Sequence, residues 1–156
     1  MLLRGKCHCG NISLALETAL DAQALPLRAC QCSFCRMHGV RTTSDPAGRL
    51  RFEIADPAVL SRYRFGLATA DFLICGRCGA YAGALMSEGE KAWGVVNANL
   101  LAEPLTREPE PVSYEGETAA ERIARRKQRW TPAELSLPPR AGSKRSSRTG
   151  SRRRRP

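Results

Sequence analysis

Seven cysteines are grouped into three short motifs, and their spacing limits the chemistry open to them. The motifs are C-x-C at Cys7 and Cys9, C-x-C-x-x-C at Cys30, Cys32 and Cys35, and C-x-x-C at Cys75 and Cys78. An odd number of thiols cannot pair off completely, and neighbours two or three positions apart do not cross-link distant segments. The spacings are those of metal sites, so metal binding is favoured over disulfides.

The first and last motifs predict a closed structural zinc site. Thiolate is the ligand that zinc prefers, and four thiolates complete a tetrahedral site. In a straight strand Cys7 and Cys9 would lie on one face and His8 on the other, which favours the two cysteines as co-ligands. Around Cys75 and Cys78, the glycines Gly76 and Gly79 would supply permissive φ angles for a turn. This site would link the beginning of the domain to a late strand.

The middle motif leaves more than one interpretation open. Cys30, Cys32 and Cys35 could hold a zinc ion with one open position, as catalytic zinc sites do. His38 could instead close the site as a fourth ligand, although an exposed loop histidine is also expected there. An iron–sulfur cluster held by these thiols is a further alternative. For Cys7, Cys9, Cys75 and Cys78 the alternative to a metal site is a set of buried reduced thiols.

Short runs of alternating apolar and polar residues dominate the first hundred positions and predict half-buried strands. We expect strands within 11–16, 49–56, 60–66, 71–75, 81–86 and 92–101. Glycine and proline separate these runs at short intervals, so the fold class is mainly β, as a small barrel or a pair of packed sheets.

The composition divides the chain into three parts. Residues 1–104 form the zinc-binding β domain, and residues 105–137 form a Pro/Glu-rich connector followed by a helix. Thr118 could cap that helix with Glu121 three residues on, and Pro132 would end it. Residues 138–156 form an Arg-rich tail without aromatic or large aliphatic residues, which predicts disorder.

Charge and hydropathy bear on location and partners. The net charge is +10, but residues 1–120 carry 12 basic and 13 acidic side chains, against 13 and 2 in residues 121–156. The basicity therefore belongs to the C-terminal part, and any nucleic-acid binding is expected there. No apolar run is long enough to span a membrane, and the N-terminus lacks a signal sequence, so we expect a cytoplasmic protein.

Three stretches in this order carry a resemblance to a known family: GKCHCGNISL, CQCSFCR and FLICGRCGAYAG. They resemble the glutathione-dependent formaldehyde-activating enzyme family, which includes the centromere protein V domain, from about Gly5 to about Leu101. The resemblance implies a mainly β, β-tent-like domain. It also implies two zinc ions, one held by Cys7, Cys9, Cys75 and Cys78 and one held by Cys30, Cys32 and Cys35 with an open position.

The resemblance further implies carbon–sulfur lyase chemistry, in which the sulfur of glutathione or a similar thiol adds to formaldehyde or a related aldehyde. Cys30, Cys32 and Cys35 would then be catalytic. Arg36 could bind a glutathione carboxylate, and Asn97 could donate a hydrogen bond near the open position, although a surface arginine and a polar strand residue explain both equally well. The competing class is a non-catalytic zinc module whose basic tail binds nucleic acid or another acidic partner.

Overall fold

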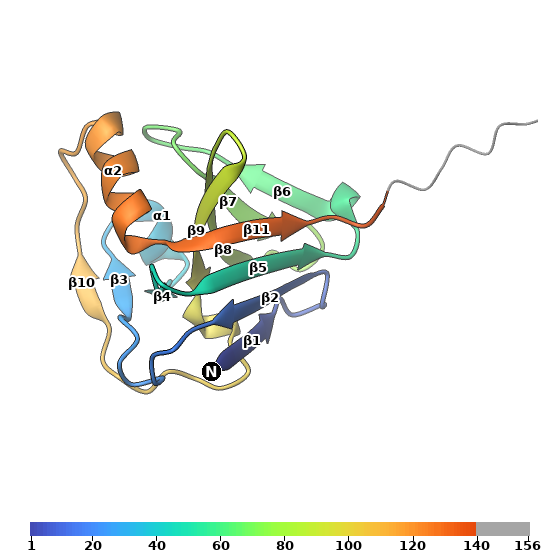
Figure 1. Cartoon of the computed structure of the whole chain (residues 1–156). Helices are drawn as coiled ribbons and strands as arrows, with labels where there is room; N and C mark the ends of the chain where they lie inside the picture. Colours follow the sequence, from blue (N-terminus) through green and yellow to red (C-terminus); the bar gives the residue numbers. More distant parts are fainter. Residues whose placement is uncertain (140–156) are drawn as a thin grey trace, which may run out of the picture.

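Figure 1 shows the computed structural model, which describes residues 1–139 of the chain. The strands are β1 (Leu2–Lys6), β2 (Ile12–Glu17), β3 (Arg28–Cys30), β4 (Thr42–Thr43), β5 (Arg49–Ile54), β6 (Leu60–Tyr63), β7 (Asp71–Cys75), β8 (Tyr81–Glu88), β9 (Lys91–Asn97), β10 (Glu110–Val112) and β11 (Thr131–Ser136). The helices are α1 (Ser33–Met37) and α2 (Ala119–Arg129), with two short 3-10 turns, η1 (Pro57–Val59) and η2 (Ala98–Leu100). The mainly β prediction is confirmed.

All the strands belong to one branched sheet. Its main path runs β1-β2-β5-β11-β9-β4-β3-β10, and β8, β7 and β6 follow one another outward from β9. Most neighbours are antiparallel, but β11 pairs parallel to β5 and β10 pairs parallel to β3. The final strand therefore lies in the interior of the sheet, between β5 and β9, and joins its two halves (Figure 1).

The core lies where the two halves face each other. In β5 the alternation of the sequence becomes an alternation of burial, with Leu50, Phe52 and Ile54 inside and their neighbours exposed. A β-carbon at Gly83 of β8 would lie 2.8 Å from the Phe52 ring, so the close approach of β8 to β5 requires glycine there. The six predicted strand regions all contain strands, and in β2, β5 and β7 the periodicity of the sequence reflects alternating burial.

Helix α2 begins as its sequence indicates. The Thr118 side chain accepts a hydrogen bond from the Glu121 amide, and the Glu121 carboxylate accepts one from the Thr118 amide, which completes a capping box. The helix ends at Arg129, and Trp130 is already extended ahead of Thr131 and Pro132. No helix within residues 1–139 is long and apolar enough to cross a membrane.

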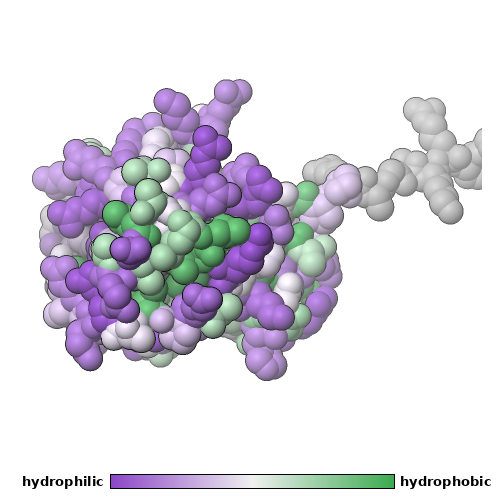
Figure 2. All heavy atoms as spheres, turned by 60° about the horizontal axis from the view of Figure 1, so that its bottom comes forward, coloured by the Kyte–Doolittle hydropathy of each residue, from purple (hydrophilic) through white to green (hydrophobic). Residues whose placement is uncertain are grey.

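Several elements were not expected from the sequence: β1, β3, β4, β10, β11 and α1. The segment 105–137 in particular is more than a connector with a helix, since it also supplies β10 and β11. Figure 2 turns the lower side of Figure 1 forward and shows hydrophobic residues gathered there, with hydrophilic residues around them. The expected disordered tail lies almost entirely outside the described residues.

Candidate functional site

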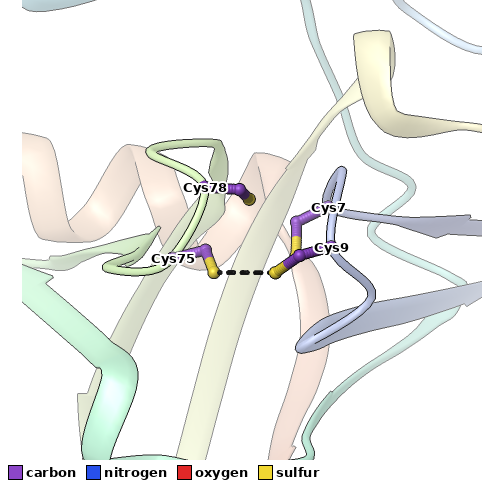
Figure 3. Close-up of side chains that lie close together, drawn as sticks. All are labelled: Cys7, Cys9, Cys75 and Cys78. Atoms are coloured by element: carbon purple, nitrogen blue, oxygen red, sulfur yellow. Dashed lines mark hydrogen bonds between the residues drawn. The ribbon is translucent and has the colours of Figure 1, made fainter.

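Four cysteines from two distant turns meet at one point (Figure 3). Cys7 and Cys9 belong to the turn between β1 and β2, whereas Cys75 ends β7 and Cys78 lies in the turn before β8. Their four Sγ atoms all lie within 4.8 Å of one another. Cys9 Sγ lies 3.8 Å from Cys7 Sγ and 3.5 Å from Cys75 Sγ. Tetrahedral zinc with Zn–S bonds of ~2.3 Å requires S···S distances of about 3.8 Å, so this group fits a metal ion.

The turns bring the thiols together in a way that partly differs from expectation. Residues 7–9 form a turn rather than a strand: the Gly10 amide donates to the Cys7 carbonyl, with Gly10 at a φ of +80°. Cys7 and Cys9 still point to one group, and His8 is exposed outside it. The straight-strand argument was therefore wrong in its geometry, although it selected the correct pair.

In the second turn the two glycines have different roles. Gly79 adopts a φ of +75° and donates its amide to the Cys75 carbonyl at 2.7 Å, as the sequence predicted. Gly76 does not have a positive φ. Its amide donates to the Val59 carbonyl at 2.7 Å, and a β-carbon there would lie 3.1 Å from the same oxygen. Gly76 therefore provides space for the backbone, not a left-handed conformation.

Backbone amides prepare this group for deprotonation. Burial raises the pKa of the Cys75 thiol to about 11. Burial opposes ionisation of Cys78 as well, but the amides of Ala80 and Cys9, with the neighbouring thiols, outweigh it and lower the pKa of Cys78 to about 6. The Ile12 amide donates to Cys7 Sγ at 3.3 Å. A metal ion needs thiolate ligands, and donors aimed at sulfur favour that form.

The middle motif forms a second group, of three thiols. Cys30 ends β3, Cys32 caps the N-terminus of α1 and Cys35 lies in its first turn, where the Cys35 amide donates to Cys32 Sγ at 3.4 Å. The three Sγ atoms lie within 4.8 Å of one another. All seven cysteines are free thiols, so each group presents its full set of sulfur donors and could hold a metal ion.

His38 does not belong to the three-thiol group. It is exposed at the C-terminal end of α1, and its ring packs on Phe34 with 4.4 Å between ring centroids. Among residues 1–139 the group contains no histidine or carboxylate within 4.8 Å of all three sulfurs. The arrangement therefore offers three protein donors rather than four.

The three thiols differ in their tendency to ionise. A hydrogen bond from the Cys35 thiol, helped by the Cys32 amide and by Arg125, lowers the pKa of Cys30 to about 5 although burial opposes it. The same hydrogen bond raises the pKa of Cys35. Cys30 is thus the more acidic thiol of the pair, and Arg125 of helix α2 lies close enough to influence it.

The three thiols open into a cavity of about 470 Å³, whereas the four-cysteine group does not line it. Aromatic side chains form part of the wall: Phe65, Phe72, Tyr81 and Trp130. Basic side chains form another part: Arg28, Arg122, Arg125, Arg126 and Arg129. A cavity of this size, with apolar walls and a few convergent polar groups, is typical of a small-molecule site.

The arginines of this wall were not predicted from the sequence. The basicity of the C-terminal part was expected to lie in a tail separate from the domain, yet α2 places four arginines in the cavity beside the cysteines. The signal was present: positions 122, 125, 126 and 129 follow the i, i+3, i+4, i+7 spacing of one helix face. Arg28 had no comparable local signal, because its place depends on the pairing of β3.

Arg36 and Asn97 do not line the cavity. Arg36 is exposed in the last turn of α1. Asn97 is buried; its Nδ2 donates to the Tyr81 carbonyl at 2.9 Å and its Oδ1 accepts from the Asn99 amide at 3.2 Å. Asn97 therefore holds the backbone of a cavity residue, and both of its polar atoms are engaged away from the cysteines.

Comparisons with known proteins bear on the architecture. No family model and no curated protein matches the chain, so the resemblance to formaldehyde-activating enzymes stays a prediction. A crystal structure of a Rhodobacter sphaeroides protein, a structural-genomics target, is similar to this chain at 29% sequence identity with a TM-score of 0.52. The match covers 70% of this chain and 99% of that one. It supports the fold and carries no function, since that protein is described by its source alone.

Proposed function

We propose that this protein is a two-zinc carbon–sulfur lyase that condenses glutathione, or a similar thiol, with formaldehyde or a related aldehyde. The observation that carries the proposal is the difference between the two cysteine groups. Four thiols lie within 4.8 Å of one another and could supply all four ligands of a metal ion, and the other three line a cavity large enough for a small molecule. In this proposal Cys7, Cys9, Cys75 and Cys78 hold a structural ion, and Cys30, Cys32 and Cys35 hold the second.

The three-thiol donor set suits zinc with an open position, and a zinc ion bound there would supply the acidity that deprotonates an incoming thiol. The thiol sulfur then forms a bond to the aldehyde carbon. The electron pair of the C=O π bond moves to oxygen, which takes up a proton to give an S-hydroxymethyl adduct. The reverse direction breaks the same carbon–sulfur bond.

Tyr81 is the chain's own candidate for assisting the aldehyde oxygen. Its side chain lines the cavity together with the three cysteines and is only 3% exposed. A phenol keeps its proton at neutral pH, and burial raises the pKa of Tyr81 further. The Tyr81 Oη–H group can therefore donate a hydrogen bond to the oxygen on which negative charge develops.

Calorimetric titration of glutathione into the zinc-loaded protein tests the proposal. We expect binding at or below millimolar ligand in the wild type and its loss in Cys32→Ser, which removes one donor of the cavity group alone. Absence of binding by the wild type at millimolar glutathione would reject the proposal. Turnover is checked with 13C-labelled formaldehyde, whose NMR signal should move to the S-hydroxymethyl position faster with the wild type than with Cys32→Ser.

A further inference from the structure

Helix α2 lines the cavity with a face of like charges, of which Arg126 is buried, Arg122 and Arg125 are half-buried and Arg129 is exposed. Arg122, Arg125, Arg126 and Arg129 occupy successive turns of one helix face, and Arg28 of β3 joins them. Like charges three or four residues apart on a helix repel one another. An exposed arginine such as Arg129 is commonly a solubilising residue, but that explanation fails for Arg126, which is buried.

One carboxylate, that of Glu117, pairs with two of the five guanidinium groups within residues 1–139. The Glu117 carboxylate accepts a hydrogen bond from Arg125 Nη2 at 2.9 Å and another from Arg122 Nε at 3.1 Å. Arg125 also lies over the Tyr114 ring, 3.5 Å from its centroid. Tyr114 and Glu117 thus hold these two arginines in place within the wall.

The other three arginines have no carboxylate partner among residues 1–139. Arg28 donates to the Ser44 hydroxyl at 3.1 Å, and Arg126 donates to the Thr69 hydroxyl at 2.7 Å. No ion pair within 4.0 Å involves Arg28, Arg126 or Arg129 in this part of the chain. Within residues 1–139, Glu115 is the one acidic residue in the cavity wall. The cavity therefore carries an excess of positive charge.

Arg126 has no partner for one of its buried donors. It is 7% exposed, and its Nε–H group is buried with no hydrogen-bond acceptor among residues 1–139, although its Nη1 donates to Thr69. Burial, with repulsion from Arg125 and Arg122, lowers the pKa of Arg126 to about 10. The Trp130 ring lies 4.6 Å from the guanidinium carbon, which supports the plane of the group but leaves Nε unsatisfied. A buried N–H without an acceptor is unfavourable, and a charged one more so.

We propose that the cavity contains an oxyanion subsite, centred on Arg126 and flanked by Arg28 and Arg129, which binds the carboxylate or phosphate group of a thiol ligand. The planar fork of a guanidinium matches both oxyanions, and Arg126 Nε supplies the free donor. The subsite shares its cavity with the three thiols. A ligand with a thiol at one end and an oxyanion at the other can reach both.

The thiol half of this inference rests on the proposed function, whereas anion binding does not. Inorganic phosphate is therefore the first probe. We expect phosphate to bind the metal-loaded wild type and to bind Arg126→Met at least ~10-fold more weakly, since hydrogen bonds to charged groups contribute this much. Lys127→Met is the matched control: it removes one positive charge from the next position of the helix, outside the cavity. Equal weakening in both variants would reject the subsite.

Thermal unfolding separates a ligand-binding role of Arg126 from a structural one. Methionine keeps an unbranched apolar stem, so a subsite residue that is unfavourably buried without ligand should give a melting temperature equal to or above that of the wild type. A structural arginine would instead give a lower melting temperature in Arg126→Met. Added phosphate should raise the melting temperature of the wild type and leave that of Arg126→Met unchanged.

Thiols that differ in charge complete the test. Binding of 2-mercaptoethanol, its O-phosphate and 3-mercaptopropionate is followed through the visible spectrum of the Co(II)-substituted protein. We expect the two anionic thiols to bind at least ~10-fold more tightly than 2-mercaptoethanol, with the advantage lost in Arg126→Met. Their ranking distinguishes a phosphate from a carboxylate ligand. Equal binding of all three thiols would reject the subsite but support thiol chemistry. Phosphate binding that depends on Arg126, together with no change in the Co(II) spectrum when thiols are added, would support the subsite and reject the proposed function.

Discussion

At the scale of single residues, the two cysteine groups differ in what surrounds the sulfur atoms. Backbone amides approach the thiols of the four-cysteine group, whose four sulfurs could supply every ligand of a tetrahedral ion. In the three-thiol group a hydrogen bond from the Cys35 thiol lowers the pKa of Cys30, and the group faces an arginine-rich cavity. The first environment favours a permanently held ion, and the second leaves room for an exchangeable ligand.

This difference predicts opposite effects of removing one thiol from each group. Cys75→Ser should lose the ion that links the β1–β2 turn to the β7–β8 turn, and with it most of the stability, because structural zinc contributes about 10–16 kcal/mol in small zinc domains. Cys32→Ser should lose one ion and keep a cooperative unfolding transition. Native mass spectrometry gives the metal count, and circular dichroism gives the transition. Global unfolding of Cys32→Ser would contradict the division into two groups.

The site residues that could be predicted from the sequence were those that lie close together along the chain. The grouping of Cys30, Cys32 and Cys35 was predictable because a turn and a short helix suffice to bring neighbours together. Arg36 was assigned to the same site because it follows Cys35 in the sequence, and Asn97 because of its position in a strand. Neither residue lines the cavity. Arg28 lies there because β3 pairs with β4 and β10, a long-range arrangement that no local pattern reveals.

At the scale of elements, α2 determines the shape and charge of the cavity. Its capping box sets where the helix begins, and therefore which face the arginines at 122, 125, 126 and 129 occupy. Glu117, just before the cap, then anchors two of these arginines. The start of the helix could be predicted from Thr118 and Glu121 alone, but the direction of its basic face could not, because that depends on packing against the sheet.

Loss of the cap should weaken the helix and the cavity together. Thr118→Ala removes the side-chain acceptor for the Glu121 amide and should lower the free energy of unfolding by about 1 kcal/mol. Thr118→Ser keeps that acceptor and should remain close to the wild type. Urea unfolding followed by circular dichroism measures both variants. Equal stability of the alanine variant and the wild type would show that sheet packing alone holds α2.

Glu117 gives the helix a defined dependence on pH. Hydrogen bonds from Arg125 and then Arg122 lower the pKa of the Glu117 carboxylate to about 2. Because the folded pKa lies below the unfolded value of ~4.3, this contribution is complete above about pH 5 and is lost as the pH falls towards 2. Glu117→Gln should therefore be less stable than the wild type by about 1 kcal/mol at pH 7, a value reduced by solvent screening of a partly exposed group.

The comparison of wild type and Glu117→Gln is made by urea unfolding between pH 7 and pH 3. The cysteine groups are the same in both proteins, so any metal held by them would be lost alike as the pH falls, and the difference between the two proteins reports on Glu117. We expect that difference to shrink towards acid pH. A difference that stays constant over this range would mean that the carboxylate charge does not stabilise the helix.

At the scale of the whole molecule, the last strand, β11, lies in the interior of the sheet between β5 and β9. The N-terminal half, β1-β2-β5, and the half formed by β9 with β8, β7 and β6 are joined in the sheet by β11. Thr131 and Pro132 pair with β9, and positions 133–136 then pair with β5. The sequence did not predict this strand because it is polar, contains a proline and follows a helix directly, which are features of a linker.

The position of β11 predicts that the last described residues are required for folding. Ending the chain at Trp130 would expose the edges of β5 and β9 and the Asp45 amide, which donates to buried Thr131 Oγ1 at 2.8 Å. We expect this variant to melt at least ~10 °C lower than the wild type or to lose its cooperative transition, since several kcal/mol of sheet pairing and burial disappear.

A chain ending at Pro139 is the control, because it keeps all the strands and helices of residues 1–139. We expect it to unfold at the same temperature as the full-length protein. The four-cysteine group still links the two halves in both shortened chains, so the comparison also measures whether a metal link can replace a strand. If the chain ending at Trp130 kept the melting temperature of the control, the metal ion would be the main connection between the halves. The strand is expected to be indispensable, because a metal ion holds two turns together but cannot satisfy the exposed N–H and C=O groups of two open sheet edges.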